Sequence, residues 1–411
     1  MEVRPGYKQT EVGVIPDEWG TSALLAVADC LDNLRVPLND AQRQRMQGDI
    51  PYCGANGVLD YVNDFVVDDD IILMAEDGGY FHEYASRPIA YRMQGKCWVN
   101  NHAHILKAKR GHDQGFLFYS LVHKNILPFL ASGTRAKLNK SEMEKIVVPA
   151  PPSETEQRAI AAALSDSNAL LGGLDRLIAK KRDLKQAAMQ QLLTGQTRLP
   201  GFSGGWEVKL LKQVAEISTG INKPLSEMGS GALYVTVQDL YDGTSIRTNR
   251  LSRIKVSPSE IDAKGLAVGD IVFGKSSVKR EGIGYPSQFR GCGEPVVFSG
   301  FTYRARARQG IADAIFLFYT LRTEKTRRWL IDNSQASALT NINQQIADAI
   351  PVQVPPTYLE QTAIAAVLSD MDAELAALEA RRDKTRDLKQ AMMQELLTGK
   401  TRLVPAGVAR A

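Results

Sequence analysis

Apolar side chains recur at heptad-like spacing in two long segments of the chain. This spacing is typical of helices that bury one stripe of side chains against a partner helix. Each segment begins with a proline pair followed by Ser or Thr and, three residues later, Glu, which is a pattern that caps a helix start. Each ends in Leu-Leu-Thr-Gly, with glycine where a left-handed C-terminal cap belongs. The apolar positions are Ile160, Leu164, Leu171, Leu174, Ile178 and Leu184 in the first segment and Ile364, Leu368, Met371, Leu375, Leu378 and Leu388 in the second.

A long internal repeat relates the two segments. Residues 184–199 and 388–403 are identical at 13 of 16 positions, at an offset of 204. At about 1.5 Å per residue, each predicted helix is roughly 60 Å long. The apolar stripe of each helix needs a partner, and the simplest partner is the other copy. We therefore expect a pseudo-two-fold internal repeat in which a long antiparallel two-helix coiled coil holds two globular domains apart.

The regions outside these helices are not visibly similar to each other. Short apolar runs bounded by turn residues, at 70–75 and 271–273 for example, predict strands in both regions. A helix is predicted after the strands in each region, over residues 114–130 and 311–331. We therefore expect two copies of an α/β (α+β) domain. The expected divisions are residues 1–150 for the first domain, 151–199 for the central long helix, 200–355 for the second domain, and 356–411 for the C-terminal long helix and tail.

The overall composition is that of an ordinary globular protein. The chain has 411 residues, of which 44% are hydrophobic and 23% charged, and its formal net charge is +4. No apolar run reaches the roughly 20 residues of a membrane span, and the first residues do not form a signal peptide. Four cysteines without a CxxC pair argue against a disulfide framework and a zinc ribbon. We therefore expect a cytoplasmic protein with no membrane partner.

Basic residues are concentrated in two places. Residues 247–308 hold twelve Lys or Arg against five acids, and residues 92–140 hold nine against Asp113 alone. Lys and Arg that displace counterions from phosphates supply much of the affinity for DNA, and Arg and Asn side chains suit base edges. A solvated basic face is the alternative interpretation. The candidate DNA contacts are Tyr52, Asn56, Asn101, Lys275, Lys279, Arg280, Arg290, Arg304 and Arg306, with Tyr52 and Asn56 as base readers in the first domain and Lys279 and Arg280 in the second.

Two patterns that suggest other chemistry are rejected. Residues 269–276 fit the G-x4-G-K-S pattern of a phosphate-binding loop, but a strand-like run, residues 271–273, lies where that motif needs a flexible loop. His102 and His104 could share a strand face, but no partner ligands complete a metal site, so we expect a structural role for them. No motif for amino-methyl transfer, hydrolysis or nuclease chemistry is visible. We therefore expect neither a catalytic nor a metal site.

With two dissimilar basic domains and two near-identical long helices, the chain resembles the specificity (S) subunit of Type I restriction–modification systems over essentially its whole length. The most specific motifs are Pro-Pro-x4-Gln-x2-Ile-Ala, around Gln157 and Gln361, and Leu-Leu-Thr-Gly-x-Thr-Arg-Leu, which ends at Leu199 and Leu403. Residues 15–19 and 200–206 are similar to the paired starts of the family's two target-recognition domains. Residues 133–139 and 339–343 are similar to the loops before each conserved helix, which adds Arg135, Lys137, Asn139, Asn341 and Asn343 to the candidate DNA contacts.

The resemblance implies a non-catalytic, DNA-binding subunit of a multisubunit methyltransferase and endonuclease that serves host defence. Each target-recognition domain would read one half of a bipartite, asymmetric double-stranded DNA target. Two methyltransferase (modification) subunits would dock on the helices, and restriction/translocase subunits would join them. S-adenosylmethionine, ATP and Mg²⁺ would be bound by those partners, and no cofactor by this chain.

The residues assigned to docking and spacing are Gln157, Leu164, Leu171, Leu174, Leu184, Leu192, Gln361, Leu368, Leu375, Leu378, Leu388 and Leu396. One alternative is a stand-alone sequence-specific DNA-binding protein of the same architecture, without a restriction partner. A nucleotide hydrolase would rest only on the rejected match at residues 269–276.

Overall fold

The chain folds into two units that each use parts of both long helices. The structure, a computed structural model, describes residues 3–131, 136–241, 243–336 and 339–403. The first unit comprises Met1–Asp175 with Ala380–Ala411, and the second unit comprises Arg176–Glu379. The last part of the chain therefore completes the unit that contains its beginning.

The two long helices begin and end where the sequence predicts. They are α5 (Glu154–Leu192) and α11 (Tyr358–Leu396). The hydroxyls of Ser153 and Thr357 accept hydrogen bonds from the backbone amides three residues on, at 3.4 and 3.3 Å. Gly195 and Gly399, just beyond the helices, have φ angles of +71° and +64°. The predicted helix caps are therefore confirmed at both ends of both copies.

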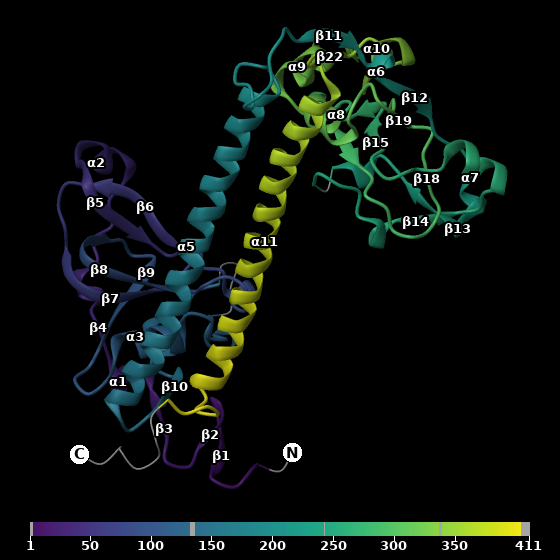
Figure 1. The fold of residues 1–411 in the computed structure, drawn as a ribbon. Coiled ribbons are helices and arrows are strands. Elements are labelled where there is room, and N and C mark those ends of the chain that lie inside the picture. The colour runs from purple at the N-terminus through teal and green to yellow at the C-terminus, as the bar shows by residue number, and fades with distance from the viewer. Residues whose placement is uncertain (1–2, 132–135, 242, 337–338, 404–411) are drawn as a thin grey trace. The chain divides into compact units, whose positions relative to one another are not determined.

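The helices run antiparallel where they pack. In the second unit, Lys181 near the end of α5 pairs with Glu374 in the first half of α11, at 2.6 Å. In the first unit, the Ser167 hydroxyl lies 3.6 Å from the sulfur of Met392. Figure 1 shows α5 and α11 side by side. The predicted antiparallel helix pair is therefore confirmed.

The predicted apolar stripe is wrong at Leu184 and Leu388, which are 48% and 59% exposed. Alternating steps of four and three residues, continued from Ile178, lead to Lys181 and Lys185 and miss position 184. Ion pairs therefore continue the contact between the helices where leucines were expected. The other leucines assigned to docking and spacing are buried at Leu164, Leu174, Leu192, Leu368, Leu375 and Leu396 and partly buried at Leu171 and Leu378.

The first unit is built on a six-stranded sheet of order β4-β9-β7-β8-β5-β6. Its strands are β4 (Ala28–Cys30), β5 (Gln47–Gly54), β6 (Gly57–Val62), β7 (Val67–Ala75), β8 (Ala90–Val99) and β9 (Ala103–Ala108). Neighbouring strands are antiparallel, except that β5 pairs with β8 in parallel. The smaller strands are β1 (Tyr7–Thr10), β2 (Gly13–Pro16), β3 (Gly20–Ala23) and β10 (Val147–Ala150), and the helices before α5 are α1 (Leu24–Val27), α2 (Asp40–Arg45), α3 (Gln114–Leu121) and α4 (Lys140–Met143).

The second unit divides the corresponding strands between two sheets, of order β12-β19-β15-β17 and β14-β13-β18. These strands are β12 (Ala215–Thr219), β13 (Met228–Val235), β14 (Ser252–Ile254), β15 (Ile271–Gly274), β17 (Pro286–Gln288), β18 (Val296–Phe298) and β19 (Thr302–Ala307). The other strands are β11 (Glu207–Leu210), β16 (Ser276–Ser277), β20 (Gln335–Ala336), β21 (Thr340–Asn341) and β22 (Pro351–Val354). The helices are α6 (Leu211–Val214), α7 (Pro258–Lys264), α8 (Ala314–Leu321), α9 (Glu324–Asn333) and α10 (Gln344–Asp348).

The strand pairings of the main sheets correspond between the two units. The pairs β4·β9, β9·β7, β7·β8 and β5·β6 have the antiparallel counterparts β12·β19, β19·β15, β15·β17 and β13·β14. The parallel pair β5·β8 corresponds to β13·β18. One topology therefore occurs twice, although the strand sequences are not visibly similar. Among the described residues, no helix is both long and apolar enough to cross a membrane.

Candidate nucleic-acid interface

Two buried glutamines join the long helices to the sheet domains. The side-chain carbonyl of Gln157 accepts a hydrogen bond from the amide of Asp113 at 2.9 Å, and that of Gln361 accepts one from Asp313 at the same distance. Asp113 and Asp313 are the N-caps of α3 and α8. Gln157 and Gln361 are only 2% and 3% exposed. The prediction that these glutamines dock a partner is therefore wrong, because each is committed to the interior of its own unit.

A buried ion pair closes each unit, and in the first unit it lies beside a tryptophan. Arg402 donates to the Glu156 carboxylate at 2.9 Å, and the indole nitrogen of Trp19 donates to the same carboxylate at 3.3 Å. In the second unit, Arg198 donates to Glu360 at 2.6 Å. Both carboxylates belong to the first turn of a long helix, and both arginines follow the end of the other long helix. The Thr-Gly-x-Thr-Arg motif of each helix thus covers the start of the other.

A buried histidine holds the loop before α4 in the first unit. The two ring nitrogens of His104 lie 2.7 Å from a carboxylate oxygen of Asp32 and 2.8 Å from the backbone carbonyl of Leu138. Burial of the imidazole opposes its charge, but the hydrogen bond and ion pair with Asp32 outweigh burial and raise the pKa of His104 to about 9. Both nitrogens therefore carry protons and donate to oxygen.

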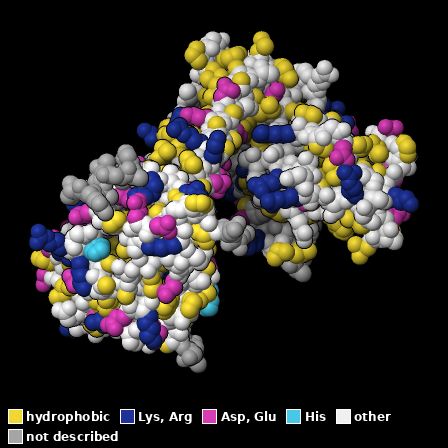
Figure 2. Space-filling model, turned by 90° about the horizontal axis from the view of Figure 1, so that it is seen from below, with side chains coloured by type: hydrophobic (Ala, Val, Ile, Leu, Met, Phe, Trp, Pro, Cys, Tyr) yellow, Lys and Arg dark blue, Asp and Glu magenta, His cyan; other side chains and the backbone are white. Residues whose placement is uncertain are grey.

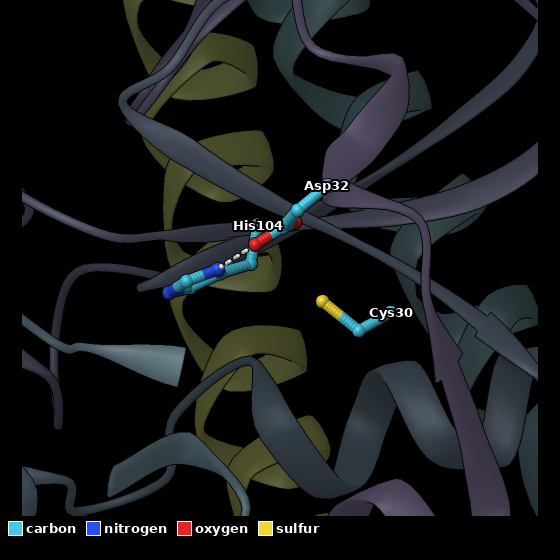
Figure 3. Close-up of side chains that lie close together, drawn as sticks. All are labelled: Cys30, Asp32 and His104. Carbon is cyan, nitrogen blue, oxygen red and sulfur yellow. Dashed lines mark hydrogen bonds and ion pairs between the residues drawn. The ribbon is translucent and has the colours of Figure 1, made fainter. Parts of the chain in front are cut away.

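The same cluster has the residue types of a metal site. Ligand atoms of Cys30, Asp32 and His104 lie within 4.8 Å of one another. Figure 3 shows His104 turned toward Asp32, with Cys30 off to one side. Since a metal ligand must present an unprotonated nitrogen, the hydrogen bonds of His104 favour an imidazolium that orders the loop, in line with the structural role expected for it.

The candidates of the first unit differ widely in exposure. Tyr52 is 2% exposed, and its hydroxyl accepts a hydrogen bond from the amide of Leu38 at 2.9 Å. The prediction that Tyr52 reads bases is therefore wrong, because β5 turns this side chain into a cluster with Trp98. Asn56 and Asn101 are exposed at turns. The Asn56 amide donates to the carbonyl of Gly78 at 2.9 Å.

The loop before α4 holds three further candidates. The Lys137 ammonium pairs with Glu76 at 2.9 Å, so part of its charge is compensated within the fold. Asn139 is exposed at the N-cap of α4, and its side chain makes no capping hydrogen bond there. Arg135 lies outside the described residues.

In the second unit, several predicted cations and amides lie at the surface. Lys279, Arg280, Arg290 and Asn343 are exposed and Asn341 is partly buried. The Asn343 side chain caps α10 by accepting a hydrogen bond from the amide two residues into that helix. The Lys275 ammonium donates to the Thr219 hydroxyl at 2.7 Å, and burial lowers the pKa of Lys275.

Arg304 is buried, and Arg306 is held in an ion pair within the fold. Arg304 is 3% exposed and donates to the carbonyl of Gly265 at 3.1 Å. Arg306 donates to both carboxylate oxygens of Asp270, at 2.8 and 2.7 Å. The prediction that Arg304 contacts DNA is therefore wrong, because β19 directs this side chain into the interior. The side chain of Arg306 is 39% exposed, so a contact of Arg306 with DNA stays a prediction. Figure 2 shows Lys and Arg side chains interspersed with acidic ones on the visible face.

A groove of about 1020 Å³ opens beside the predicted cations of the second unit. It is formed by the segments that follow β13, β15 and β18, together with the segment around the short helix 225–227. Lys279 lines the groove, and Lys275 and Arg280 flank lining residues in the chain. No pattern in the sequence predicts the apolar side chains that line this groove. The large apolar side chains exposed there are Leu225, Tyr241, Val278, Phe301 and Leu339.

The rejected phosphate-loop match lies in this part of the chain. Ile271–Gly274 form β15, a buried strand paired on both sides. A strand cannot present the ring of free backbone amides that a phosphate-binding loop needs. The strand on which this match was rejected is therefore confirmed.

Comparisons with known proteins agree with this architecture. The family model for the Type I restriction modification DNA specificity domain matches residues 16–175 and 203–385. The type I restriction enzyme MjaVIII specificity subunit of Methanocaldococcus jannaschii is 26% identical over 313 residues, which cover 71% of each chain. A relative from Haemophilus influenzae, named for the same subunit class, is 36% identical over 143 residues, and the match covers only 35% of each chain.

A solved structure shares the fold over nearly the whole chain. The crystal structure of a Type-I restriction-modification system S subunit from M. genitalium has a TM-score of 0.63 and covers 96% of this chain and 98% of its own. The identity is 13%, so this likeness concerns the fold alone.

Proposed function

The chain belongs to the family of Type I restriction modification DNA specificity proteins, and on this basis we propose that its two units read the two halves of a bipartite, asymmetric DNA target. A single observation carries the proposal. One strand topology occurs twice with matched pairings, while the residues at its surface differ between the copies. A shared scaffold with different surfaces suits two readers of different base sequences.

An exchange of domains tests this proposal. Residues 20–150 are replaced by the matching segment of another family member, and the methylated sequence in the host is determined by methylome sequencing. One half of the target should change, and the other half should stay the same. The reciprocal control exchanges residues 207–354 and should alter the other half. A change of both halves in either chimera would replace two independent readers with one composite DNA surface.

The long helices are the proposed docking sites for two methyltransferase subunits, to which restriction subunits would be added. Leu184 and Leu388 support this proposal. They occupy equivalent positions of the repeat, and each is exposed and lies outside the contact between the helices. On α5, Leu170 and Leu177 are also exposed and precede Leu184 at seven-residue steps. Exposed apolar side chains at equivalent places in two copies suit two copies of one partner.

Substitution of the exposed leucines by glutamate tests whether they contact the methyltransferase subunit. Leu184→Glu and Leu388→Glu should each weaken co-purification of the methyltransferase subunit, and the double variant should abolish it. The matched control is Val208→Glu, since Val208 is 63% exposed and lies in β11, off the helices. Unchanged co-purification in the double variant would remove these leucines from the interface. A chain that binds DNA specifically but recruits no methyltransferase would be a stand-alone DNA-binding protein.

Cofactors are proposed to belong to the partner subunits. S-adenosylmethionine and ATP with Mg²⁺ should therefore not bind the isolated chain, and ATP should not be hydrolysed by it. Equilibrium dialysis and a phosphate-release assay check this, with the complete complex as the positive control.

A further inference from the structure

The groove of the second unit exposes apolar side chains to an unusual degree. Leu225 is 89% exposed, Val278 is 87% exposed and Phe301 is 63% exposed. All three line the same groove of about 1020 Å³. Exposed apolar side chains gathered in one concave surface mark a place where a ligand is bound.

These side chains are not needed to build the domain. Among the described residues, none of the three belongs to the hydrophobic clusters that hold the second unit together. Each extends from a connecting segment. Leu225 begins the short helix 225–227, Val278 follows β16, and Phe301 lies between β18 and β19. The domain therefore presents an apolar surface that is not part of its hydrophobic core.

The charge around this surface fits a polyanion. Lys279 lines the groove and is exposed, and no ion pair involves it among the described residues. The neighbouring Arg280 is also exposed, and it donates to the backbone carbonyl of Ile331 at 3.4 Å. One acidic residue, Glu281, also lines the groove. Lys223, another lining residue, is held by Glu227 and Glu260 at 3.3 and 3.0 Å. Lys279 is thus the cation of the groove that is placed to meet a phosphate, and Arg280 is exposed next to it in the chain.

Duplex DNA presents one apolar group that such a wall can recognise from the major groove, the 5-methyl group of thymine. We propose that the groove of the second unit contacts thymine methyl groups through Leu225, Val278 and Phe301, while Lys279 and Arg280 contact the adjacent phosphates. The proposal rests on the proposed function and adds the chemistry by which the second half-site is read. Burial of one methyl group changes an affinity about fourfold.

Uracil substitution tests the contact, because uracil differs from thymine only by this methyl group. The complex with its methyltransferase subunits is used, and the target is first read from the host methylome. Each thymine of the half-site assigned to residues 207–354 is replaced singly by uracil. At one or more positions, binding should weaken about threefold to tenfold in competition assays. Uracil in the other half-site should have the same effect in the variants below as in the parent chain.

Side-chain truncation should remove the discrimination. Val278→Ala and Phe301→Ala should bind uracil DNA about as well as the parent does and lose most of the preference for thymine. The matched control is Val268→Ala, because Val268 is 76% exposed in the same unit and does not line the groove. This control should keep the full preference. Circular dichroism melting of each variant confirms that it is folded.

Several outcomes would overturn the inference and leave the proposed function intact. A second half-site without an A·T pair would do so, as would specific binding that is insensitive to uracil. Normal discrimination in both truncated variants, with impaired recruitment of the restriction subunit, would assign the groove to a protein partner. Absence of any sequence preference in the whole complex would instead contradict the proposed function itself.

Discussion

The side-chain carbonyl of Gln157 accepts a hydrogen bond from the backbone amide of Asp113, 2.9 Å away, and thereby fastens the start of α3 to the start of α5. The amide group of the same glutamine donates to the carbonyl of Pro151 at 2.9 Å. Gln361 repeats the arrangement with Asp313 and Ile311. A motif that the resemblance linked to partner docking is therefore an internal clamp.

We predict that Gln157→Ala destabilises the first unit and Gln361→Ala the second. Each change leaves a buried amide and a carbonyl without their side-chain partner, which costs about 1–3 kcal/mol. Urea unfolding of the full chain measures the free energy of unfolding. Gln186→Ala is the matched control, because Gln186 is an exposed residue of α5. Equal losses in Gln186→Ala and Gln157→Ala would refute the clamp.

Arg402→Met should be far more damaging than removal of an exposed arginine. The side chain of Glu156 has 0% exposure, so loss of Arg402 leaves a buried charge unpaired and costs about 3–5 kcal/mol. Arg158→Met is the control, since Arg158 is 64% exposed and its ion pair with Glu154 is worth about 0–1 kcal/mol. Adding Glu156→Gln to Arg402→Met should recover part of the loss. Calorimetric melting distinguishes these variants, and no recovery in the double variant would contradict the account.

Loss of the proton from His104 should make the first unit less stable at alkaline pH. Its folded pKa of about 9 lies above the ordinary value of 6.5. The stabilisation from the charged imidazole is therefore complete below about pH 6.5 and is lost as the pH rises through about 9, by an amount on the order of 3 kcal/mol. Denaturation curves from pH 6 to pH 10 measure this slope. His104→Gln should lack the slope, and His82→Gln, at an exposed position, should keep it.

Substitution of buried and of exposed cations in the second unit should have different effects. Arg304→Met should lower stability by about 1–3 kcal/mol, because it removes charged hydrogen bonds in the interior, and should leave the salt dependence of DNA affinity unchanged. Lys279→Ala and Arg290→Ala should each reduce the slope of log affinity against log salt by about one. Binding titrations of the complex at several salt concentrations provide the comparison. An altered slope in folded Arg304→Met would place this arginine on DNA.

Local patterns explain why much of the fold is predictable from the sequence. The helix caps at Ser153 and Gly195 depend on neighbouring residues, so a short motif suffices to find them. A heptad pattern that is followed through apolar residues alone misplaces Leu184. Steps of four and three that include Lys181 and Lys185 keep the register.

The candidate site is harder to predict, because burial depends on residues far apart in the chain. Alternation along a strand shows that Arg304 and Arg306 share a face. It does not show that their hydrogen-bond acceptors, Gly265 and Asp270, lie on that face. Likewise, Leu225, Val278 and Phe301 meet in one groove although more than twenty residues separate each from the next. A single exposed apolar residue on a loop carries no local signal of this kind.

The first unit is assembled from two segments, one translated before the second unit and one translated after it. Trp19, Ile160 and Leu164 share a hydrophobic cluster with Leu396, which leaves the ribosome after the whole of the second unit has been translated. The second unit is contiguous in the chain and can fold while synthesis continues, whereas the first must keep an apolar surface uncovered until the last helix arrives. A premature stop codon near the end of the gene would therefore damage the half of the protein that was made first.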